Sequence, residues 1–144
     1  MNVFHLAISS LIYSLLLIVT VACFGTSEAQ PFVNTGLILV DQGDLEGAIS
    51  NYSEAIELDG FYIPAYRQRA KLYLEMGRAD LAVNDYSRII LLVGAESSSL
   101  AGRGEAYTTA GSFDLAIADL DEAIIKDRFN AKAYFLRAAA LTAN

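Results

Sequence analysis

The stretch GEAYTTAGSFDLAIADLDEAI, residues 104–124, carries the pattern that decides the fold of this protein. It contains no reactive side chain, yet its smallest residues occupy regular places. Gly104 lies in a first predicted helical segment, which Gly111 interrupts. Small and apolar residues then recur at steps of four and three, which is the spacing of one helix face: Ala116, Leu120 and Ala123. The stretch therefore predicts two short helices separated by a glycine.

The same residue types return along the chain at a fixed offset of 34 residues. One column of small residues comprises Gly36, Ala70, Gly104 and Ala138, and a second comprises Ala48, Ala82 and Ala116. A glycine column comprises Gly43, Gly77 and Gly111, and a column of large residues comprises Tyr52, Tyr86 and Leu120. So many columns at one spacing identify an internal repeat.

At these residues the sequence resembles the tetratricopeptide repeat family, whose unit is a 34-residue antiparallel helix pair. The resemblance implies an all-α fold, a right-handed solenoid over residues 30–144. Its units would be 29–62, 63–96 and 97–130, followed by a terminal helix at 131–142. The proline that usually ends each unit is replaced here by Gly60, Gly94 and Arg128.

The small columns have a physical reason, which is the close approach of paired helices. A larger side chain at Gly104 or Ala116 would push the helices apart, and such overpacking costs about 1–3 kcal/mol. The glycine column suits left-handed helix caps between the helices of each pair. Three arginines also recur at the repeat spacing, namely Arg69, Arg103 and Arg137, and we expect them to pair with Asp85 and Asp119 inside the scaffold.

The first 27 residues carry no charged side chain unless His5 is protonated, and the run from Leu6 to Phe24 is almost entirely apolar. Its length lies between that of a secretory signal and that of a spanning helix. Small residues at Ser27 and Ala29 favour cleavage after Ala29 and export to the periplasm or the exterior. Two alternatives remain, a single-pass membrane anchor at 1–29 and a lipid anchor on Cys23.

The charge of the protein argues against nucleic acid or an anionic lipid surface as its main partner. The formal net charge is −7 over 144 residues, and no basic side chain precedes Arg67. An acidic N-terminal part of this kind would repel phosphate groups. A membrane is therefore expected as a partner only through residues 1–29, if they are not cleaved.

No catalytic or metal-binding constellation is present, so the sequence predicts neither an enzyme nor a cofactor. Residues 30–144 contain no His and no Cys, which excludes a Ser-His pair, a thiolate and the usual zinc ligands. The segment 41–46 lacks the alternating oxygen ligands of a calcium loop. The carboxylates of Asp119, Asp121 and Glu122 are interpreted as a solvated helix face, with Glu122 paired to Lys126 four residues on.

Family members usually bind peptides along a concave groove formed by the first helix of each unit. By resemblance, that groove would be lined by Val33, Asn34, Leu37, Asp41, Arg67, Gln68, Lys71, Glu75, Ala101, Glu105, Thr108 and Thr109. The residues predicted to bind a partner are Asn34, Leu37, Arg67, Lys71, Glu105 and Thr108. A simpler alternative is that Lys71 pairs with Glu75 on the surface and Arg67 is solvated.

Some relatives hold the C-terminal carboxylate of a partner with a Lys and Asn clamp. Val33 and Leu37 replace its polar residues in the first unit, and a groove that is apolar at one end and basic in the middle suits a peptide with an acidic residue. The sequence thus predicts a non-catalytic protein-binding module. The alternative is a structural subunit of an envelope assembly that packs through the ends of the solenoid.

The C-terminal helix would be one of the solenoid ends through which a structural subunit packs. Its apolar residues are Tyr134, Phe135, Leu136 and Leu141, more than one neighbouring helix shields easily. One prediction is that this surface is buried, either in a homodimer or by a partner that supplies the missing second helix. The other is a simple cap that exposes only Phe135 or Leu136.

Overall fold

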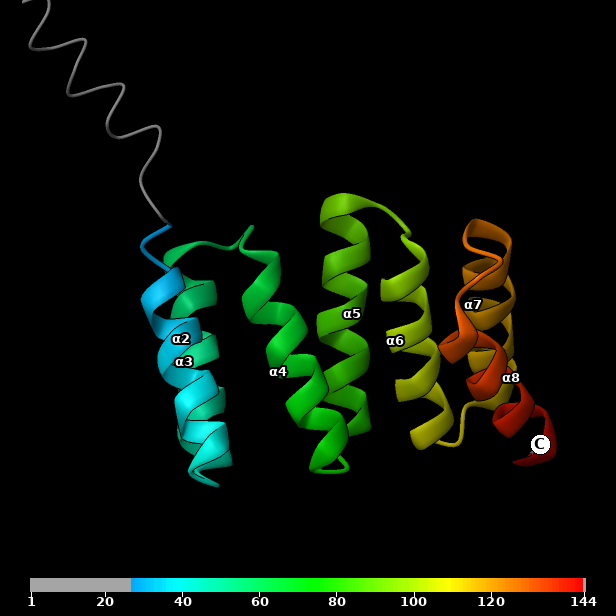
Figure 1. Cartoon of the computed structure of the whole chain (residues 1–144), viewed down its shortest axis with the longest axis horizontal. Helices are drawn as coiled ribbons and strands as arrows, with labels where there is room; N and C mark the ends of the chain where they lie inside the picture. The colour runs from blue at the N-terminus through cyan, green and yellow to red at the C-terminus, as the bar shows by residue number, and fades with distance from the viewer. Residues whose placement is uncertain (1–26, 144) are drawn as a thin grey trace, which may run out of the picture.

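The computed structural model describes residues 27–143, and this part of the chain contains seven α-helices and no strand. The helices are α2 (Gln30–Asp41), α3 (Leu45–Leu58), α4 (Ile63–Glu75), α5 (Ala79–Val93), α6 (Ser97–Thr109), α7 (Phe113–Lys126) and α8 (Ala131–Ala143). They lie side by side along the long axis of the molecule, and each one packs against the next in chain order (Figure 1). The predicted all-α solenoid of helix pairs is confirmed.

Each helix pair turns at a glycine in a left-handed backbone conformation. Gly43, Gly77 and Gly111 have φ angles of 81°, 71° and 74°, a region that side chains with a Cβ rarely adopt. This confirms the caps predicted from the glycine column. Pro31 and Pro64 lie in the first turns of α2 and α4, where the missing N–H of proline removes no helical hydrogen bond.

The small columns lie where two helices approach most closely. A Cβ added at Gly36 would lie 2.4 Å from the ring of Tyr52, and one added at Gly104 would lie 2.7 Å from Leu120. Ala48, Ala82 and Ala116 are fully buried. These positions must be small because a large neighbour from the partner helix already fills the space beside them.

The hydrophobic core is shared between consecutive helix pairs. The central cluster joins Tyr66 and Ala70 of α4 to Ala82, Tyr86 and Ile89 of α5, and it reaches Ala106 of α6. Two further clusters lie on either side of it, one built around α2 and α3 and the other around α7 and α8. A single pair therefore leaves part of its apolar surface for the next pair to cover.

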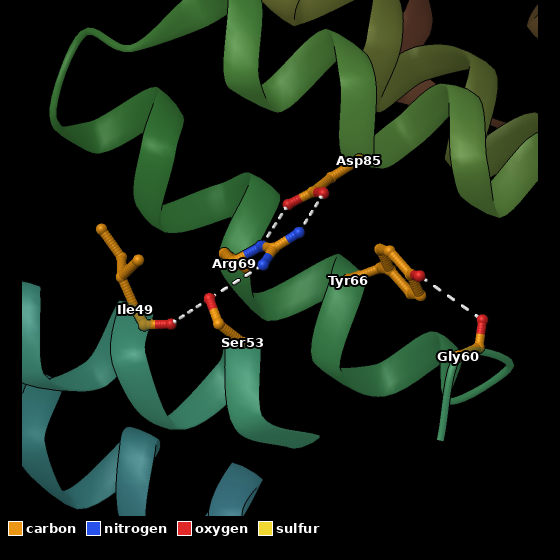
Figure 2. A network of polar contacts seen from close by, with 6 residues as sticks. All are labelled: Ile49, Ser53, Gly60, Tyr66, Arg69 and Asp85. Atoms are coloured by element: carbon orange, nitrogen blue, oxygen red, sulfur yellow. Dashed lines mark hydrogen bonds and ion pairs between the residues drawn. The ribbon is translucent and has the colours of Figure 1, made fainter. Parts of the chain in front are cut away.

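A partly buried arginine connects three helices at the first repeat boundary (Figure 2). Arg69 of α4 forms two parallel hydrogen bonds to Asp85 of α5, at 2.9 and 2.7 Å. Its third nitrogen donates to the hydroxyl of Ser53 on α3 at 2.8 Å, and that hydroxyl donates to the carbonyl of Ile49. Burial by itself lowers the pKa of Arg69, but the hydrogen bonds and the charge of Asp85 raise it above its usual value.

The next repeat boundary has the same network one repeat further on. Arg103 bonds Asp119 at 2.6 and 2.8 Å and reaches Ser87 at 3.3 Å. Both predicted pairs are therefore confirmed. The interpretation of Asp119 as part of a solvated helix face is wrong, because Asp119 is only 8% exposed. Arg137 differs in its carboxylate partner. It turns instead to Asp121, 16 residues before it, at 2.8 Å.

The helix α8 covers α7 but leaves apolar side chains exposed. Leu136 is buried, with 8% of its surface exposed, so of the two residues that a cap was expected to expose, it is not the exposed one. Tyr134, Phe135 and Leu141 are exposed at 43%, 73% and 56%. A cap that exposes only one apolar residue is therefore wrong, because the inward face of α8 is occupied by Ala133, Leu136 and Ala140.

Residues 1–26 lie outside the described part of the chain, and the predictions of a signal peptide, a membrane anchor or a lipidated Cys23 concern them. Between residues 27 and 143, no helix is long and apolar enough to cross a membrane. The described chain begins with Ser27, and Ala29 is fully buried in the core around α2 and α3.

Candidate peptide-binding groove

The first helices of the units, α4, α6 and α8, border a hollow of about 280 Å³. We call it the basic hollow, because it contains three cationic side chains. Its lining residues are Arg67, Lys71, Tyr86, Ser98, Ala101, Gly102, Asn130 and Lys132. The hollow therefore brings together residues from the second, third and fourth units.

Tyr86 forms the floor of the basic hollow although it belongs to α5, a second helix. Its ring occupies the space that a side chain at position 102 would need, since a Cβ on Gly102 would lie 2.4 Å from the ring. Burial and the charge of Glu105, opposed by Arg67, raise the pKa of Tyr86 to about 12. The phenol therefore stays protonated at neutral pH and can donate a hydrogen bond.

Two of the three cations in the basic hollow have no ion-pair partner among residues 27–143. Lys132 is bound to Glu105 at 2.7 Å, whereas no ion pair involves Arg67 or Lys71. The alternative surface pair of Lys71 with Glu75 is not formed in the described structure. Two like charges four residues apart on one helix repel each other unless an anion lies between them.

A second, smaller hollow of about 70 Å³ adjoins the first at Lys71. We call it the apolar hollow, because Leu37, Val40, Tyr52 and Leu72 supply most of its wall. Gln68 and Glu75 complete its lining. The predicted groove, apolar at one end and basic in the middle, thus corresponds to these two hollows and their shared lysine.

The structure brings together some of the residues predicted to bind a partner and separates others. Arg67 and Lys71 line the basic hollow, and Leu37 lines the apolar one. Glu105 adjoins the basic hollow through its ion pair with Lys132. Asn34 is exposed on α2 and accepts a hydrogen bond from Gln30, while Thr108 donates to the carbonyl of Gly104 in its own helix.

Three further residues of the predicted groove lining line neither hollow, namely Val33, Asp41 and Thr109. Val33 is 3% exposed and belongs to the hydrophobic core, so its expected place in the groove is wrong. The reason is that the inward stripe of α2 packs on α3. Thr109 lies instead beside the turn at Gly77, at the opposite end of the helices.

Five residues of the basic hollow were not predicted from the sequence: Tyr86, Ser98, Gly102, Asn130 and Lys132. Lys132 lies 34 residues after Ser98, and extending the groove into the terminal helix would have found it. Tyr86 could not be found in this way, because it lies on a second helix and belongs to the hydrophobic core. Only the glycine at position 102 opens a path from that ring to the groove.

No group of three His, Cys, Asp or Glu side chains in the described residues 27–143 could hold a metal ion. The polar groups of the basic hollow are instead cations and hydrogen-bond donors. Such a set can form charge-assisted hydrogen bonds with carboxylates or other anions.

The sequence of the chain matches two related family profiles. The one described as TPR repeat matches residues 36–77, and the one described as tetratricopeptide repeat matches residues 67–131. Together with the glycine-capped helix pairs, these matches show that the chain belongs to the tetratricopeptide repeat family. No curated protein matches the chain significantly in sequence.

Several solved structures share the fold over most of the chain. The second TPR domain of the human RPAP3 protein, in complex with the HSP70 peptide SGPTIEEVD, is 27% identical. The alignment covers 78% of this chain and 94% of that one, with a TM-score of 0.73. The second TPR of Spaghetti (RPAP3), bound to the HSP90 peptide SRMEEVD, is 29% identical, with coverages of 70% and 94% and a TM-score of 0.65.

A tetratricopeptide repeat protein from Parabacteroides merdae has the same architecture at lower sequence identity. It is 24% identical, the alignment covers 83% of this chain and 47% of that one, and the TM-score is 0.75. This similarity concerns the fold alone.

Proposed function

We propose that this protein is a non-catalytic interaction module that binds an extended, acidic peptide segment of a protein partner in the groove formed by the two hollows. The observation that carries the proposal is the pair of cations without ion-pair partners in the described structure, Arg67 and Lys71, which line one hollow together with Tyr86. A carboxylate in the basic hollow would relieve their mutual repulsion and accept hydrogen bonds from them.

The solved structures of relatives support this class of ligand. Both RPAP3 domains were determined with bound peptides, and each peptide contains two glutamates and ends in aspartate. The apolar hollow beside Lys71 suits an aliphatic side chain next to the acidic one. A peptide that alternates acidic and apolar residues would therefore occupy both hollows.

The mode of recognition differs from a clamp on the terminal carboxylate of the partner. In the first unit, Val33 is buried and Leu37 is apolar, so neither supplies a donor to such a carboxylate. The cations lie further along the groove, on α4 and α8. We therefore propose that acidic side chains within the peptide, rather than its terminus, provide the main contacts.

Replacing both Arg67 and Lys71 by alanine should weaken binding of a fluorescein-labelled SGPTIEEVD peptide at least tenfold, which corresponds to about 1.4 kcal/mol. The reason is that the basic hollow loses both of its unpaired charges. The affinity is measured by fluorescence anisotropy at low ionic strength, because these groups are partly exposed and salt screens them. A peptide with an amidated C terminus should bind within twofold of the free acid.

The matched control is Arg128→Ala, which removes a positive charge from the exposed turn between α7 and α8, outside both hollows. An equal loss in the control would mean that only the overall charge matters. Unchanged binding in the Arg67→Ala/Lys71→Ala variant would contradict the proposal. A large loss on amidation would assign the peptide terminus, and not its side chains, to the groove.

A second candidate function is a structural subunit that assembles through its terminal helix. The exposed side chains of Tyr134, Phe135 and Leu141 on α8 favour it. If two copies pack there, Phe135→Asp with Leu141→Asp should convert a dimer to a monomer in sedimentation equilibrium, with its helicity retained. A wild-type protein that is already monomeric at high micromolar concentration would exclude this homodimer and leave the groove as the binding surface.

We propose further that the module works outside the cytoplasm or at a membrane surface. The support is the uncharged, apolar sequence from Leu6 to Phe24, which is suited to a translocon or to a bilayer. Cell fractionation of the native host tests this proposal, and recovery of the intact chain in the cytosol would contradict it.

A further inference from the structure

One edge of the solenoid carries the most exposed apolar side chains of the described chain. We call it the inter-unit rim, formed by the last turns of α3, α5 and α7 and by residues 59–62, 94–96 and 127–130. Its exposed apolar residues are Leu58, Phe61, Leu91, Val93, Ile125 and Phe129. In Figure 1 the three connections of the rim lie along the upper edge of the molecule.

The degree of exposure distinguishes the rim from the rest of the surface. Among residues 27–143, five large apolar side chains are more than 70% exposed, and four of them belong to the rim. These four are Phe61 at 75%, Leu91 at 73%, Ile125 at 77% and Phe129 at 94%. The fifth is Phe135, near the start of α8 and thus close to the same edge. Several highly exposed apolar side chains along one edge are suited to an interaction surface.

Two of these side chains belong to matching turns. The carboxylate of Asp59 accepts a hydrogen bond from the backbone N–H of Phe61 at 2.9 Å, and Asp127 does the same for Phe129 at 2.9 Å. Such side-chain to backbone bonds define the local turn. The two phenylalanines are thus presented in the same way, two repeat lengths apart on one edge.

The chain enters the fold at this same rim. The hydroxyl of Ser27 contacts the carboxylate of Asp59 at 3.5 Å, and the hydroxyl of Tyr62 bonds the side chain of Gln30. Ala29 is fully buried against the core. The start of the described chain is therefore attached to the first of the two turns, and in Figure 1 the blue end of the ribbon lies beside that edge.

We propose that residues 1–26 remain attached as a membrane anchor and that the inter-unit rim rests on the bilayer, with Phe61 and Phe129 in the lipid interface. The apolar run from Leu6 to Phe24 is close to the roughly 20 residues that a spanning helix needs. From Phe24 to Ser27 the chain reaches at most about 10 Å. An anchor of this kind holds the rim against the membrane surface.

A retained anchor excludes the cleavage after Ala29 that the sequence favours. Cleavage there would remove Ser27 from its contact with Asp59 and Ala29 from the core. The first contact lies at the rim and the second lies in the core around α2 and α3, so a retained segment preserves both.

The charges of the rim select the kind of lipid contact. The acidic residues Glu57, Asp59, Glu96 and Asp127 outnumber the basic residues Lys126 and Arg128. The rim therefore gains nothing from anionic headgroups, whose attraction requires clustered Lys and Arg. The rim instead contacts lipid by inserting apolar side chains. Zwitterionic lipid accepts these side chains as well as anionic lipid does.

The full chain contains no Trp, so single tryptophans can report on the rim. We would place the intact protein in phosphatidylcholine nanodiscs and compare Phe61→Trp and Phe129→Trp with Leu115→Trp. Leu115 is 53% exposed and lies in the first turn of α7, near the opposite edge. We expect blue-shifted emission at both rim positions and at least twofold quenching by brominated phosphatidylcholine, with little change at position 115.

Several results would overturn the proposal. One is an intact mass showing that the protein isolated from its host begins at Gln30, and another is failure of the full chain to associate with the nanodiscs. Equal quenching at all three positions, or none, would show that the rim does not face lipid. A blue shift without quenching would mean that protein, such as a second copy, covers the rim. Leu91→Trp and Ile125→Trp replace any rim variant that does not fold.

Discussion

Replacing Asp85 by alanine is expected to lower the free energy of unfolding by about 3 kcal/mol. Asp85 is 4% exposed and accepts both parallel hydrogen bonds of Arg69, whose side chain is only 18% exposed. Its loss leaves a partly buried guanidinium with only Ser53 and two tyrosine rings beside it. Equilibrium urea denaturation followed by circular dichroism measures the effect.

Two further variants separate the buried pair from surface charge. Asp121→Ala breaks the exposed pair with Arg137 and should cost less than about 1 kcal/mol. The double variant Arg69→Met/Asp85→Leu removes both charges and should be more stable than Asp85→Ala, because no charge is left buried alone. If Asp85→Ala and Asp121→Ala have equal denaturation midpoints, the inter-helix network does not stabilise the solenoid as proposed.

Ala116→Leu should destabilise the fold by about 1–3 kcal/mol more than Ala118→Leu. Ala116 is fully buried in the cluster around α7 and α8, whereas Ala118 is exposed on the other side of the same helix. The added branched carbons have no free space at position 116 and would push α7 away from its neighbours. Both variants have the same change in composition and helix propensity, so the difference between their denaturation midpoints isolates packing.

Equal midpoints for the two alanine variants would contradict the assignment of Ala116 to the close-packing column. A parallel comparison is available at Gly104, where an added Cβ would meet Leu120 at 2.7 Å. The alanine pair is the sharper test, because it avoids the change in backbone entropy that replacing a glycine introduces.

The sequence by itself determined the helix pairs, their caps and the small columns between them. It also determined the buried pairs of Arg69 with Asp85 and of Arg103 with Asp119, which recur at the same separation in consecutive units. These contacts join residues of one unit or of adjacent units. A fixed repeat therefore places them at fixed sequence offsets, where they can be recognised without coordinates.

Only the tertiary structure decided which surface remains open to a partner. The basic hollow combines Arg67 of α4, Tyr86 of α5 and Lys132 of α8 around the missing side chain of Gly102. Val33, although equivalent to Arg67 in the repeat, is covered by neighbouring helices. Exposure depends on the volumes of all the side chains that meet at a point, and these differ from unit to unit, whereas the backbone repeat that the sequence encodes stays the same.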